Sequence, residues 1–250
     1  MQLSELASYL DDYLAVREVP DWPDALNGIQ VANGGQVTRV AAAVDLCEAT
    51  ILAAASQSAD LLLVHHGLFW GGARPIAGPT YRRIAALVRH DIAVYSAHLP
   101  LDRHPEVGNN PLLAKALGIA PCGEFGETKG VTIGVWGELS IERHVLQSRI
   151  ASTLGAPPRL LPFGPSAVRR VGVITGAGGS MIAGARAAGL DTYITGEGAH
   201  HTYFDAEELG LNVFYAGHYA TETVGVQALA RHLEVKFGLP WTFLDHPTGL

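Results

Sequence analysis

The sequence predicts an α/β protein that folds as two lobes, each built around a largely parallel sheet. Short apolar runs alternate with segments of helical length along most of the chain. This alternation is typical of parallel strands that are connected by helices. Two stretches rich in Gly and Pro, residues 118–130 and 155–165, interrupt it. Eight strand candidates also exceed the usual size of one small sheet, so we expect two sheets.

Each expected element follows from the spacing of its apolar residues. An amphipathic helix opens the chain, because leucines recur at helical spacing at Leu3, Leu6, Leu10 and Leu14. Short apolar runs predict strands at residues 39–44, 60–64, 92–96, 131–136, 171–175, 191–195, 212–215 and 241–244. Segments of helical length predict helices at residues 48–57, 81–89, 141–154, 181–188 and 223–237.

The two interruptions set the predicted domain boundaries. We expect the first lobe to comprise residues 1–126 and 209–250, because the last strand and helix return to it. The second lobe is then formed by residues 127–208. Ligands of open α/β sheets bind just beyond the carboxyl ends of the strands. A functional site is therefore expected in the crevice between the two lobes.

Composition indicates a globular chain and argues against a nucleic-acid-binding protein. Of 250 residues, 48% are apolar and 16% are charged, which is too apolar for intrinsic disorder. The 17 basic and 24 acidic side chains give a formal net charge of −7. Binding to a nucleic-acid backbone needs clustered Lys and Arg, whereas the densest basic groups here are pairs such as Arg82-Arg83. A nucleic-acid partner is therefore not expected.

Localisation signals indicate the cytoplasm. The cysteines, Cys47 and Cys122, are too few for a disulfide framework. The N-terminal segment carries Glu5, Asp11 and Asp12 where a signal peptide has positive charge and then an apolar run. No apolar stretch approaches the roughly 20 residues of a membrane helix. We expect a soluble cytoplasmic protein without a membrane partner.

The strongest local signal for chemistry is the run Leu61-Leu62-Leu63-Val64 followed by His65-His66-Gly67. A continuous apolar run is typical of a buried parallel strand. A turn at Gly67 lets both imidazoles converge just beyond the strand end, where ligands bind. The alternative is that one histidine caps a turn and the other is exposed.

Two further strand candidates end in the same residue types. Residues 92–97 are followed by His98 and, four residues later, Asp102; residues 213–217 are followed by His218 and, four residues later, Glu222. In a helix, His218 and Glu222 share one face at i and i+4, as metal-binding pairs do. In isolation, each segment is also compatible with a turn cap or with a chance pattern.

Taken together, the three strand ends predict a metal site. They supply four histidines and two carboxylates, namely His65, His66, His98, His218, Asp102 and Glu222. Imidazole nitrogens combined with carboxylates that can bridge are the ligand set of two-metal hydrolytic sites. A structural zinc site would use thiolates, and neither cysteine lies in these segments. Zn, Fe, Mn and Ni all accept such ligands, so the identity of the metal stays open.

Two other segments are weaker candidates. Residues 176–180, Gly-Ala-Gly-Gly-Ser, follow a strand and precede a helix, as a phosphate-binding turn does. They lack the third glycine of the dinucleotide fingerprint and the lysine of a P-loop, so a tight turn is the favoured interpretation. We interpret the second histidine pair, His200-His201, as the exposed start of a helix rather than the mouth of the site.

The ordered motifs resemble those of the NIF-three-like dinuclear metal-centre family, whose members are often named GTP cyclohydrolase 1 type 2 homologues. The resemblance covers nearly the whole chain, from about residue 5 to Asp245, and the length is similar to that of the short bacterial form. It rests on residues 27–31, 65–70, 98–102, 108–110, 194–197 and 216–222.

This resemblance implies a fold, an assembly and a ligand set. It implies two similar α/β lobes, with the first and last thirds of the chain in one lobe, and a toroidal homohexamer whose metal sites face an internal cavity. It also implies two divalent metal ions per chain, held by His65, His66, Asp102, His218 and Glu222. His98 matches a family histidine close to the metals, either as a ligand or as a neighbour of the ligands.

The resulting hypothesis is a dinuclear-metal-dependent hydrolase with GTP cyclohydrolase-like chemistry on a small, nucleotide-type substrate. A metal-activated water attacks an electrophilic carbon. His98 is the catalytic proton shuttle, since an unperturbed histidine pKa of about 6.5 suits that task. One alternative is a non-catalytic hexameric scaffold that binds or traffics metal ions. Another is a phosphoesterase, because two-metal sites also serve in-line displacement, and the fold does not separate these activities.

Overall fold

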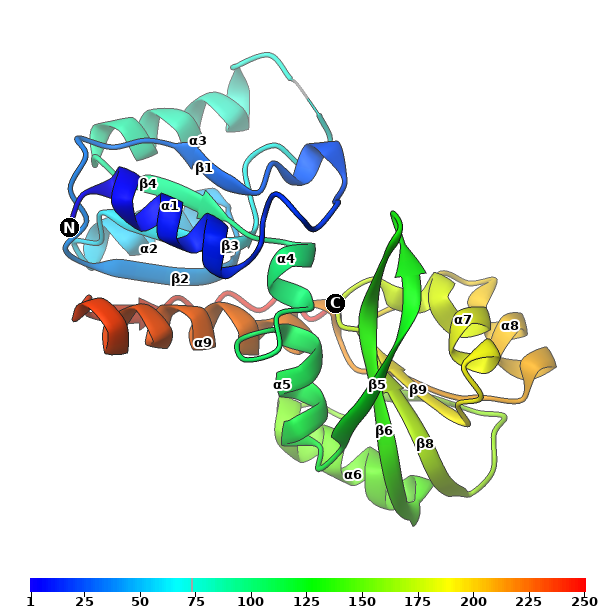
Figure 1. Ribbon diagram of the computed structural model, residues 1–250. Helices are drawn as coiled ribbons and strands as arrows, with labels where there is room; N and C mark the ends of the chain where they lie inside the picture. The colour runs from blue at the N-terminus through cyan, green and yellow to red at the C-terminus, as the bar shows by residue number, and fades with distance from the viewer. Residues whose placement is uncertain (73) are drawn as a thin grey trace. The chain divides into compact units, whose positions relative to one another are not determined.

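The computed structural model describes residues 1–72 and 74–250 and shows a mixed α/β protein with two sheets. The chain divides into two compact units (Figure 1). The first unit comprises Met1–Leu101 and Gly225–His246, and the second comprises Asp102–Val224 and Pro247–Leu250. Each unit has parallel strands at the centre of its sheet, which confirms the predicted fold class.

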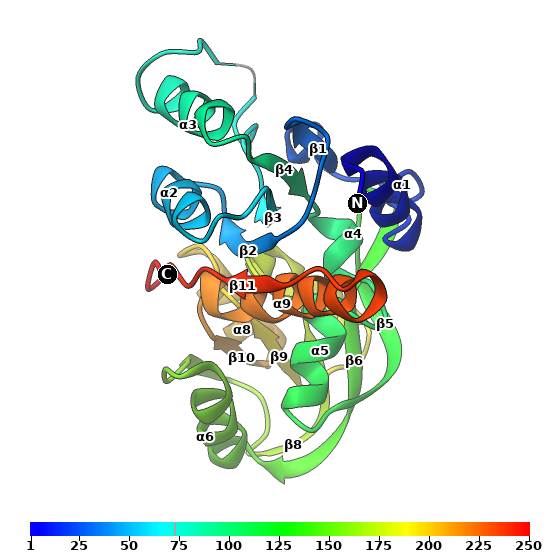
Figure 2. The same ribbon diagram turned by 90° about the vertical axis from the view of Figure 1, so that its left-hand side faces the viewer.

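The first unit is a sheet with helices on both faces. The strand order is β1-β4-β3-β2-β11, in which β1 is antiparallel to β4 and the other neighbours are parallel. The strands are β1 (Gly28–Val31), β2 (Val40–Asp45), β3 (Leu61–His66), β4 (Ala93–Ser96) and β11 (Trp241–Phe243). One face carries α2 (Glu48–Ser56) and α3 (Gly78–Arg89), and the other carries α1 (Leu3–Tyr13) (Figure 2). A short 3-10 helix, η1, covers Pro23–Ala25.

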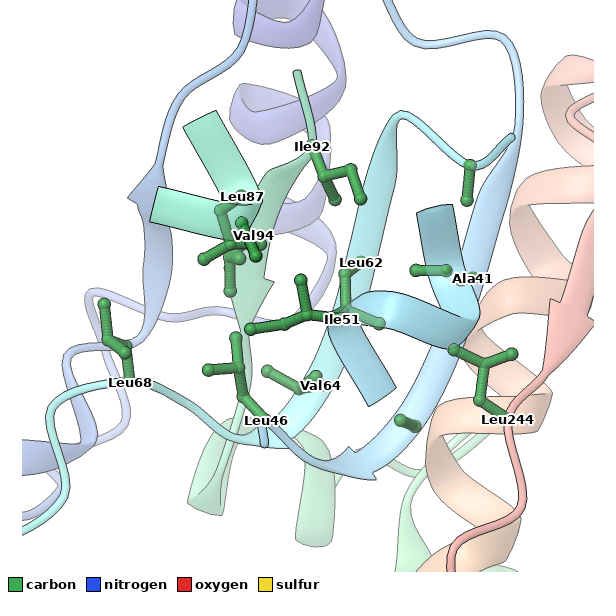
Figure 3. Close-up of a cluster of buried hydrophobic side chains, with 14 residues drawn as sticks. Ala41, Leu46, Ile51, Leu62, Val64, Leu68, Leu87, Ile92, Val94 and Leu244 are labelled. Carbon is green, nitrogen blue, oxygen red and sulfur yellow. The ribbon is translucent and has the colours of Figure 1, made fainter. Parts of the chain in front are cut away.

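Strand β3 runs through the centre of this core. Its residues Leu61–Val64 are fully buried on both faces of the sheet, as the continuous apolar run predicts. Leu62 and Val64 belong to one apolar cluster with Ile51 of α2 and Leu87 of α3 (Figure 3). Burial of each such side chain stabilises the fold by about 1.5–3 kcal/mol. The strand that ends in His65 and His66 is therefore firmly anchored.

The second unit has a six-stranded sheet in the order β5-β6-β8-β9-β10-β7. The central strands β8 (Ala167–Val173), β9 (Thr192–Thr195) and β10 (Asn212–Tyr215) are parallel. The outer strands are antiparallel to their neighbours and comprise β5 (Ala120–Thr128), β6 (Val131–Glu142) and β7 (Arg159–Pro162). The helical elements are α5 (Asn109–Ala116), α6 (Arg143–Leu154), η2 (Gly178–Met181), α7 (Ile182–Ala187) and α8 (Thr202–Leu209).

Two helices carry the chain from one unit into the other. Helix α4 (Leu99–Asp102) follows β4 and ends at the first residue of the second unit. Helix α9 (His218–Phe237) follows β10 and contains the second boundary, after Val224. Each of these helices contains one carboxylate of the predicted ligand set.

The two units repeat one arrangement of strands. In the first unit, three parallel neighbours, β2, β3 and β4, are followed at the sheet edge by the antiparallel strand β1. In the second unit, the parallel neighbours β8, β9 and β10 are followed in the same way by the antiparallel strand β7. The residue before the middle strand is an aspartate in both. Asp60 accepts backbone N–H groups of residues 38 and 39 at 2.8 and 3.1 Å, and Asp191 accepts those of residues 169 and 170 at 3.0 and 2.9 Å. In both units the aspartate therefore binds the two residues that come directly before the first residue paired with the middle strand, Val40 in β2 and Val171 in β8.

The unit boundaries differ from the predicted division into residues 1–126 with 209–250 and residues 127–208. Strand β5 lies in the second unit because it pairs with β6 along its length, and α5 packs against β6. Strand β10 lies there because it pairs with both β9 and β7. The stretches at 118–130 and 155–165 contain the outer strands β5 and β7, where Gly and Pro are tolerated.

None of the helices within residues 1–72 and 74–250 combines the length and the apolarity that crossing a membrane requires.

We predict that Asp60→Ala and Asp191→Ala each lower the free energy of unfolding by about 1–3 kcal/mol, because each leaves backbone donors without their charged acceptor. Urea denaturation followed by circular dichroism measures this. Asp12→Ala, which removes an exposed carboxylate from α1, is the control. Equal effects of the three substitutions would contradict the assigned role of the paired aspartates.

Candidate metal centre

The carboxyl ends of β3 and β4 bring three histidines of the first unit together. His65 and His66 end β3, and His98 follows β4. The strands are parallel neighbours, so their ends meet at one edge of the sheet. One ligand nitrogen of each imidazole lies within 4.8 Å of the other two. We call these three residues the histidine cluster.

Each imidazole of the histidine cluster is held through Nδ1. His65 Nδ1 lies 2.9 Å from the carbonyl oxygen of Ala97, and His66 Nδ1 lies 2.8 Å from Asp45 Oδ1. His98 Nδ1 lies 2.9 Å from Asp21 Oδ1. A carbonyl or carboxylate oxygen only accepts, so Nδ1 carries the hydrogen and Nε2 of the neutral ring carries the lone pair. This is the orientation that metal-ligating histidines have.

Asp21 is the most heavily hydrogen-bonded of these acceptors. Its carboxylate, 6% exposed, also accepts the backbone N–H groups of Trp22 and Leu99 at 2.7 and 2.9 Å and the amide of Asn27 at 2.9 Å. Burial alone would raise its pKa, but the hydrogen bond and charge of His98, with the other donors, outweigh burial and lower it. Asn27 Oδ1 accepts the backbone N–H of His98 at 2.7 Å, which fixes the start of α4.

Strand β1 fixes the loop after His66. Gln30 Oε1 accepts the backbone N–H of Leu68 at 2.6 Å, and its amide donates to the carbonyl oxygen of Ala25 at 2.9 Å. A Cβ atom at Gly67 would lie 2.3 Å from the Gln30 amide, so this close approach requires glycine. The Asn-Gly-Ile-Gln segment therefore supports the histidine cluster from a neighbouring strand.

In the second unit, His218 and Glu222 form a pair on the first turns of α9. His218 Nε2 lies 3.2 Å from Glu222 Oε2, at the predicted i, i+4 spacing. His218 Nδ1 lies 2.7 Å from Glu197 Oε1, so a carboxylate holds this ring in the same way. Glu222 is 2% exposed. A buried carboxylate beside an imidazole is a donor set suited to a cation.

The carboxylates give His218 a strongly shifted pKa. Burial lowers it, but the hydrogen bond and charge of Glu222, and then those of Glu197, outweigh burial and raise it to about 9. In the metal-free protein this imidazole is therefore protonated at neutral pH. A divalent ion that binds at Nε2 has to displace that proton.

Asp102 lies in a buried polar network of the second unit. Its Oδ1 accepts the Asn109 amide at 2.8 Å and the Thr175 hydroxyl at 3.4 Å. Asn110 Oδ1 in turn accepts the backbone N–H of Thr175 at 2.7 Å. These hydrogen bonds orient the carboxylate. A carboxylate held in this way is an oxygen donor suited to a divalent cation.

The glycine-rich segment 176–180 is a turn that makes room for Glu222. The N–H groups of Gly176, Gly178 and Gly179 are hydrogen-bonded within the second unit. These three donors are therefore not directed to an external phosphate. Gly176 has φ +63°, and a Cβ atom there would lie 2.1 Å from Glu222 Oε1. The sequence-based preference for a tight turn fits this geometry.

The structure also places the residues left aside by the sequence analysis. His200 and His201 are exposed just before α8 and belong to neither ligand group of the described residues. Sequence reasoning assigned no role to the three carboxylates that hold imidazoles, Asp21, Asp45 and Glu197. The signal for Asp45 was its position at the end of β2, level with His66 in the adjacent strand.

The donor set fits a divalent transition metal. Nitrogen donors from imidazole and oxygen donors from carboxylate suit Zn, Fe, Mn or Ni. Cys47 and Cys122 are free thiols outside these groups. His65, His66 and His98 provide nitrogen donors in the first unit, and Asp102, His218 and Glu222 provide mixed donors in the second.

Comparison with known proteins gives consistent matches over the full chain. The family model Duf34/NIF3 (NGG1p interacting factor 3) matches residues 1–248. The GTP cyclohydrolase 1 type 2 homolog of Deinococcus radiodurans is 46% identical over 248 residues, 98% of this chain and 94% of that protein. The Archaeoglobus fulgidus homolog is 44% identical over 250 residues, the whole of both chains.

Two solved structures resemble this chain closely. A structural-genomics structure titled protein ybgI, of unknown function, has a TM-score of 0.94 and 37% identity over 100% of both chains. The protein TTHA1606 from Thermus thermophilus has a TM-score of 0.91 and 43% identity over 100% of both chains.

We predict that His218 titrates near pH 9 in metal-free protein and that Glu222→Gln lowers this pKa, because the largest stabilising charge is removed. The raised pKa also means that the His218 ion pair contributes stability fully below about pH 6.5, and that this contribution is lost as pH rises through about 9. NMR titration of the His218 ring gives the pKa, and urea unfolding between pH 6 and 9.5 gives the stability. An unchanged His218 pKa in Glu222→Gln would refute the assignment.

We further predict that Gly176→Ala reduces metal content, because the new methyl group displaces the Glu222 carboxylate. Gly155→Ala is the matched control: Gly155 has φ +79°, and a Cβ atom there meets nothing within 4 Å. Both variants carry the same backbone strain, but only Gly176→Ala should lose metal. Elemental analysis after metal loading and desalting measures the difference, and equal metal content in the two variants would rule out crowding at Glu222.

Proposed function

The chain belongs to the Duf34/NIF3 family, and on this basis we propose that it is a metal-dependent hydrolase that acts on a nucleotide-type substrate. One observation carries the proposal. All four histidines at the strand ends are held at Nδ1 by a carbonyl or carboxylate oxygen, so each neutral ring carries its lone pair on Nε2. Burial of polar side chains in this arrangement lowers the stability of a core that has only a structural role, whereas a metal centre requires it.

In the proposed centre, His65, His66, Asp102, His218 and Glu222 hold two divalent ions. Five ligand residues exceed what one four-coordinate ion needs, and a carboxylate can bridge two ions. When bound, the ions supply Lewis-acid polarisation and activation of water. Asp45 and Glu197 keep His66 and His218 in the ligating orientation through their Nδ1 atoms.

His98 is the proposed proton carrier. Its Nδ1 hydrogen is directed to Asp21, so proton transfer would take place at Nε2, within the histidine cluster. The carboxylate of Asp21 keeps the ring from rotating, as the acidic partner of a catalytic histidine does. The four donors on Asp21 keep that carboxylate ionised.

The substrate class comes from the relatives. Those at 38–46% identity are named GTP cyclohydrolase 1 type 2 homolog, and we propose a nucleotide on that ground. Assembly as a homohexamer, expected from the family resemblance, is part of the same proposal. A non-catalytic metal-binding scaffold would share the ligands but would not turn over any substrate.

The test is turnover by metal-reconstituted protein. Metal-free protein is reloaded with Zn²⁺, Mn²⁺, Fe²⁺ or Ni²⁺ and assayed against GTP, other nucleoside triphosphates and a simple phosphoester. We expect metal-dependent turnover of a nucleotide that falls by orders of magnitude in His66→Ala. His200→Ala, an exposed histidine outside the ligand groups, should keep wild-type activity. Metal binding without turnover of any substrate would reject the hydrolase and favour the scaffold.

We predict two metal ions per chain in the loaded protein, measured by elemental analysis after desalting. Asp102→Ala and Glu222→Gln should each reduce the ratio, because each removes a charged oxygen donor. His200→Ala should retain it. A ratio near one that added metal does not change would rule out a dinuclear centre.

A further inference from the structure

Two tryptophans border the histidine cluster within the first unit. The ring centroid of Trp70, in the loop after β3, lies 4.8 Å from that of His98 and 5.8 Å from that of His66, with interplanar angles of 80° and 78°. The ring centroid of Trp22 lies 5.8 Å from that of His98 at 64°. Trp22 immediately follows Asp21, whose carboxylate holds His98. Both indoles are therefore positioned by the same short segments that position the imidazoles.

The segment around Trp22 exposes apolar surface. Trp22 is 39% exposed, and Leu26 and Ile29, which follow it, are 51% and 37% exposed. Ligand sites are typically lined by apolar and aromatic side chains beside a few polar groups. Indole faces in particular provide flat surfaces for stacking.

Packing alone does not explain why residue 70 is a tryptophan. Its Nε1 atom is buried, and no acceptor for it lies within hydrogen-bonding distance among the described residues. An unsatisfied buried donor lowers stability, whereas phenylalanine would fill similar space without one. The position of Trp70 edge-on to two imidazoles is therefore better explained by recognition at the histidine cluster than by the core.

The charges of these segments indicate what is recognised. Residues 20–31 contain no Lys or Arg and contain the acidic residues Asp21 and Asp24, whereas Arg74, two residues after the segment 65–72, lies against Gly71. The charges in the segment that carries Trp22 are therefore acidic, which does not favour a phosphate group beside that indole. A flat apolar face next to imidazole nitrogens suits instead a molecule in which a planar π-system adjoins the reacting bond.

We propose that Trp22 and Trp70 form a subsite for a planar heteroaromatic ring of the purine or pterin type. Trp22 is the stacking surface, and Trp70 is the wall that keeps the ring beside His66 and His98. Stacking of a base on an aromatic side chain requires no particular hydrogen-bond pattern. The subsite therefore distinguishes ligands that have a planar ring from ligands that lack one, but it does not distinguish strongly among different planar rings. This inference rests on the proposed function and specifies the part of the substrate that the first unit recognises.

The test compares ligands with and without the ring. Guanosine 5′-monophosphate, neopterin and ribose 5-phosphate are titrated into metal-loaded protein by isothermal calorimetry. We expect at least one ring compound to bind more tightly than ribose 5-phosphate. Trp22→Ala should weaken that binding roughly tenfold or more, and Trp22→Phe should retain most of it. The affinity for ribose 5-phosphate should not change.

A matched control removes an indole elsewhere in the same unit. Trp241 of β11 lies beneath Arg231 and donates to Glu234 at 3.1 Å. Trp241→Phe should bind all three compounds as the wild type does. Circular dichroism and metal content, measured on each variant, separate loss of stacking from loss of the fold or of the metal.

The outcomes separate this inference from the proposed function. If neither ring compound binds more tightly than ribose 5-phosphate, or if Trp22→Ala binds them as the wild type does, the subsite is overturned. Ring binding that depends on Trp22, without turnover of any substrate, supports the subsite and rejects the hydrolase. Metal-dependent turnover whose KM is unchanged in Trp22→Ala supports the hydrolase and rejects the subsite.

Discussion

The hydrogen bond at Nδ1 of each strand-end histidine is the constraint on which the candidate metal centre depends. A neutral imidazole has two tautomers and rotates freely, so an unsupported histidine presents the wrong nitrogen or none. An oxygen acceptor at Nδ1 removes both freedoms. In the first unit two of these acceptors, Asp45 and the carbonyl of Ala97, come from the ends of β2 and β4, on either side of β3. The register of the parallel sheet therefore determines the chemistry at its edge.

The rest of each unit maintains that register. In both sheets an aspartate before the middle strand accepts backbone N–H groups from the neighbouring chain segment, where pairing between the two strands begins. A buried apolar core also fixes the middle strand in each unit. Glycine is needed where a supporting group approaches the site, as at Gly67 beside Gln30 and Gly176 beside Glu222. The anchored strands and the closely packed loops together keep these polar groups buried. In a less tightly packed fold, water would reach them.

Sequence patterns predicted the elements and the site residues that local order determines. The run ending in His65-His66 and the i, i+4 pair His218–Glu222 are local, and the structure shows both as expected. Asp21 lies 77 residues from His98, and Asp45 lies 21 residues from His66, so only strand pairing reveals these contacts. Strand β5 was not predicted because the sequence of a Gly-containing outer strand resembles that of a loop. The predicted lobe boundary therefore differs from the observed one. Placement of the five predicted ligands in one centre is still a prediction.

The helices that cross between the units restrict how this protein can be divided. A cut at the first boundary falls inside α4, next to Asp102, and a cut at the second falls inside α9, shortly after Glu222. Each unit has its own sheet and core, yet neither can be excised without breaking a helix that holds an acidic side chain. Fragment expression, gene fission and exchange of one half between relatives are therefore all disfavoured. Although the strand arrangement repeats, the two units therefore have to be encoded and expressed as one polypeptide.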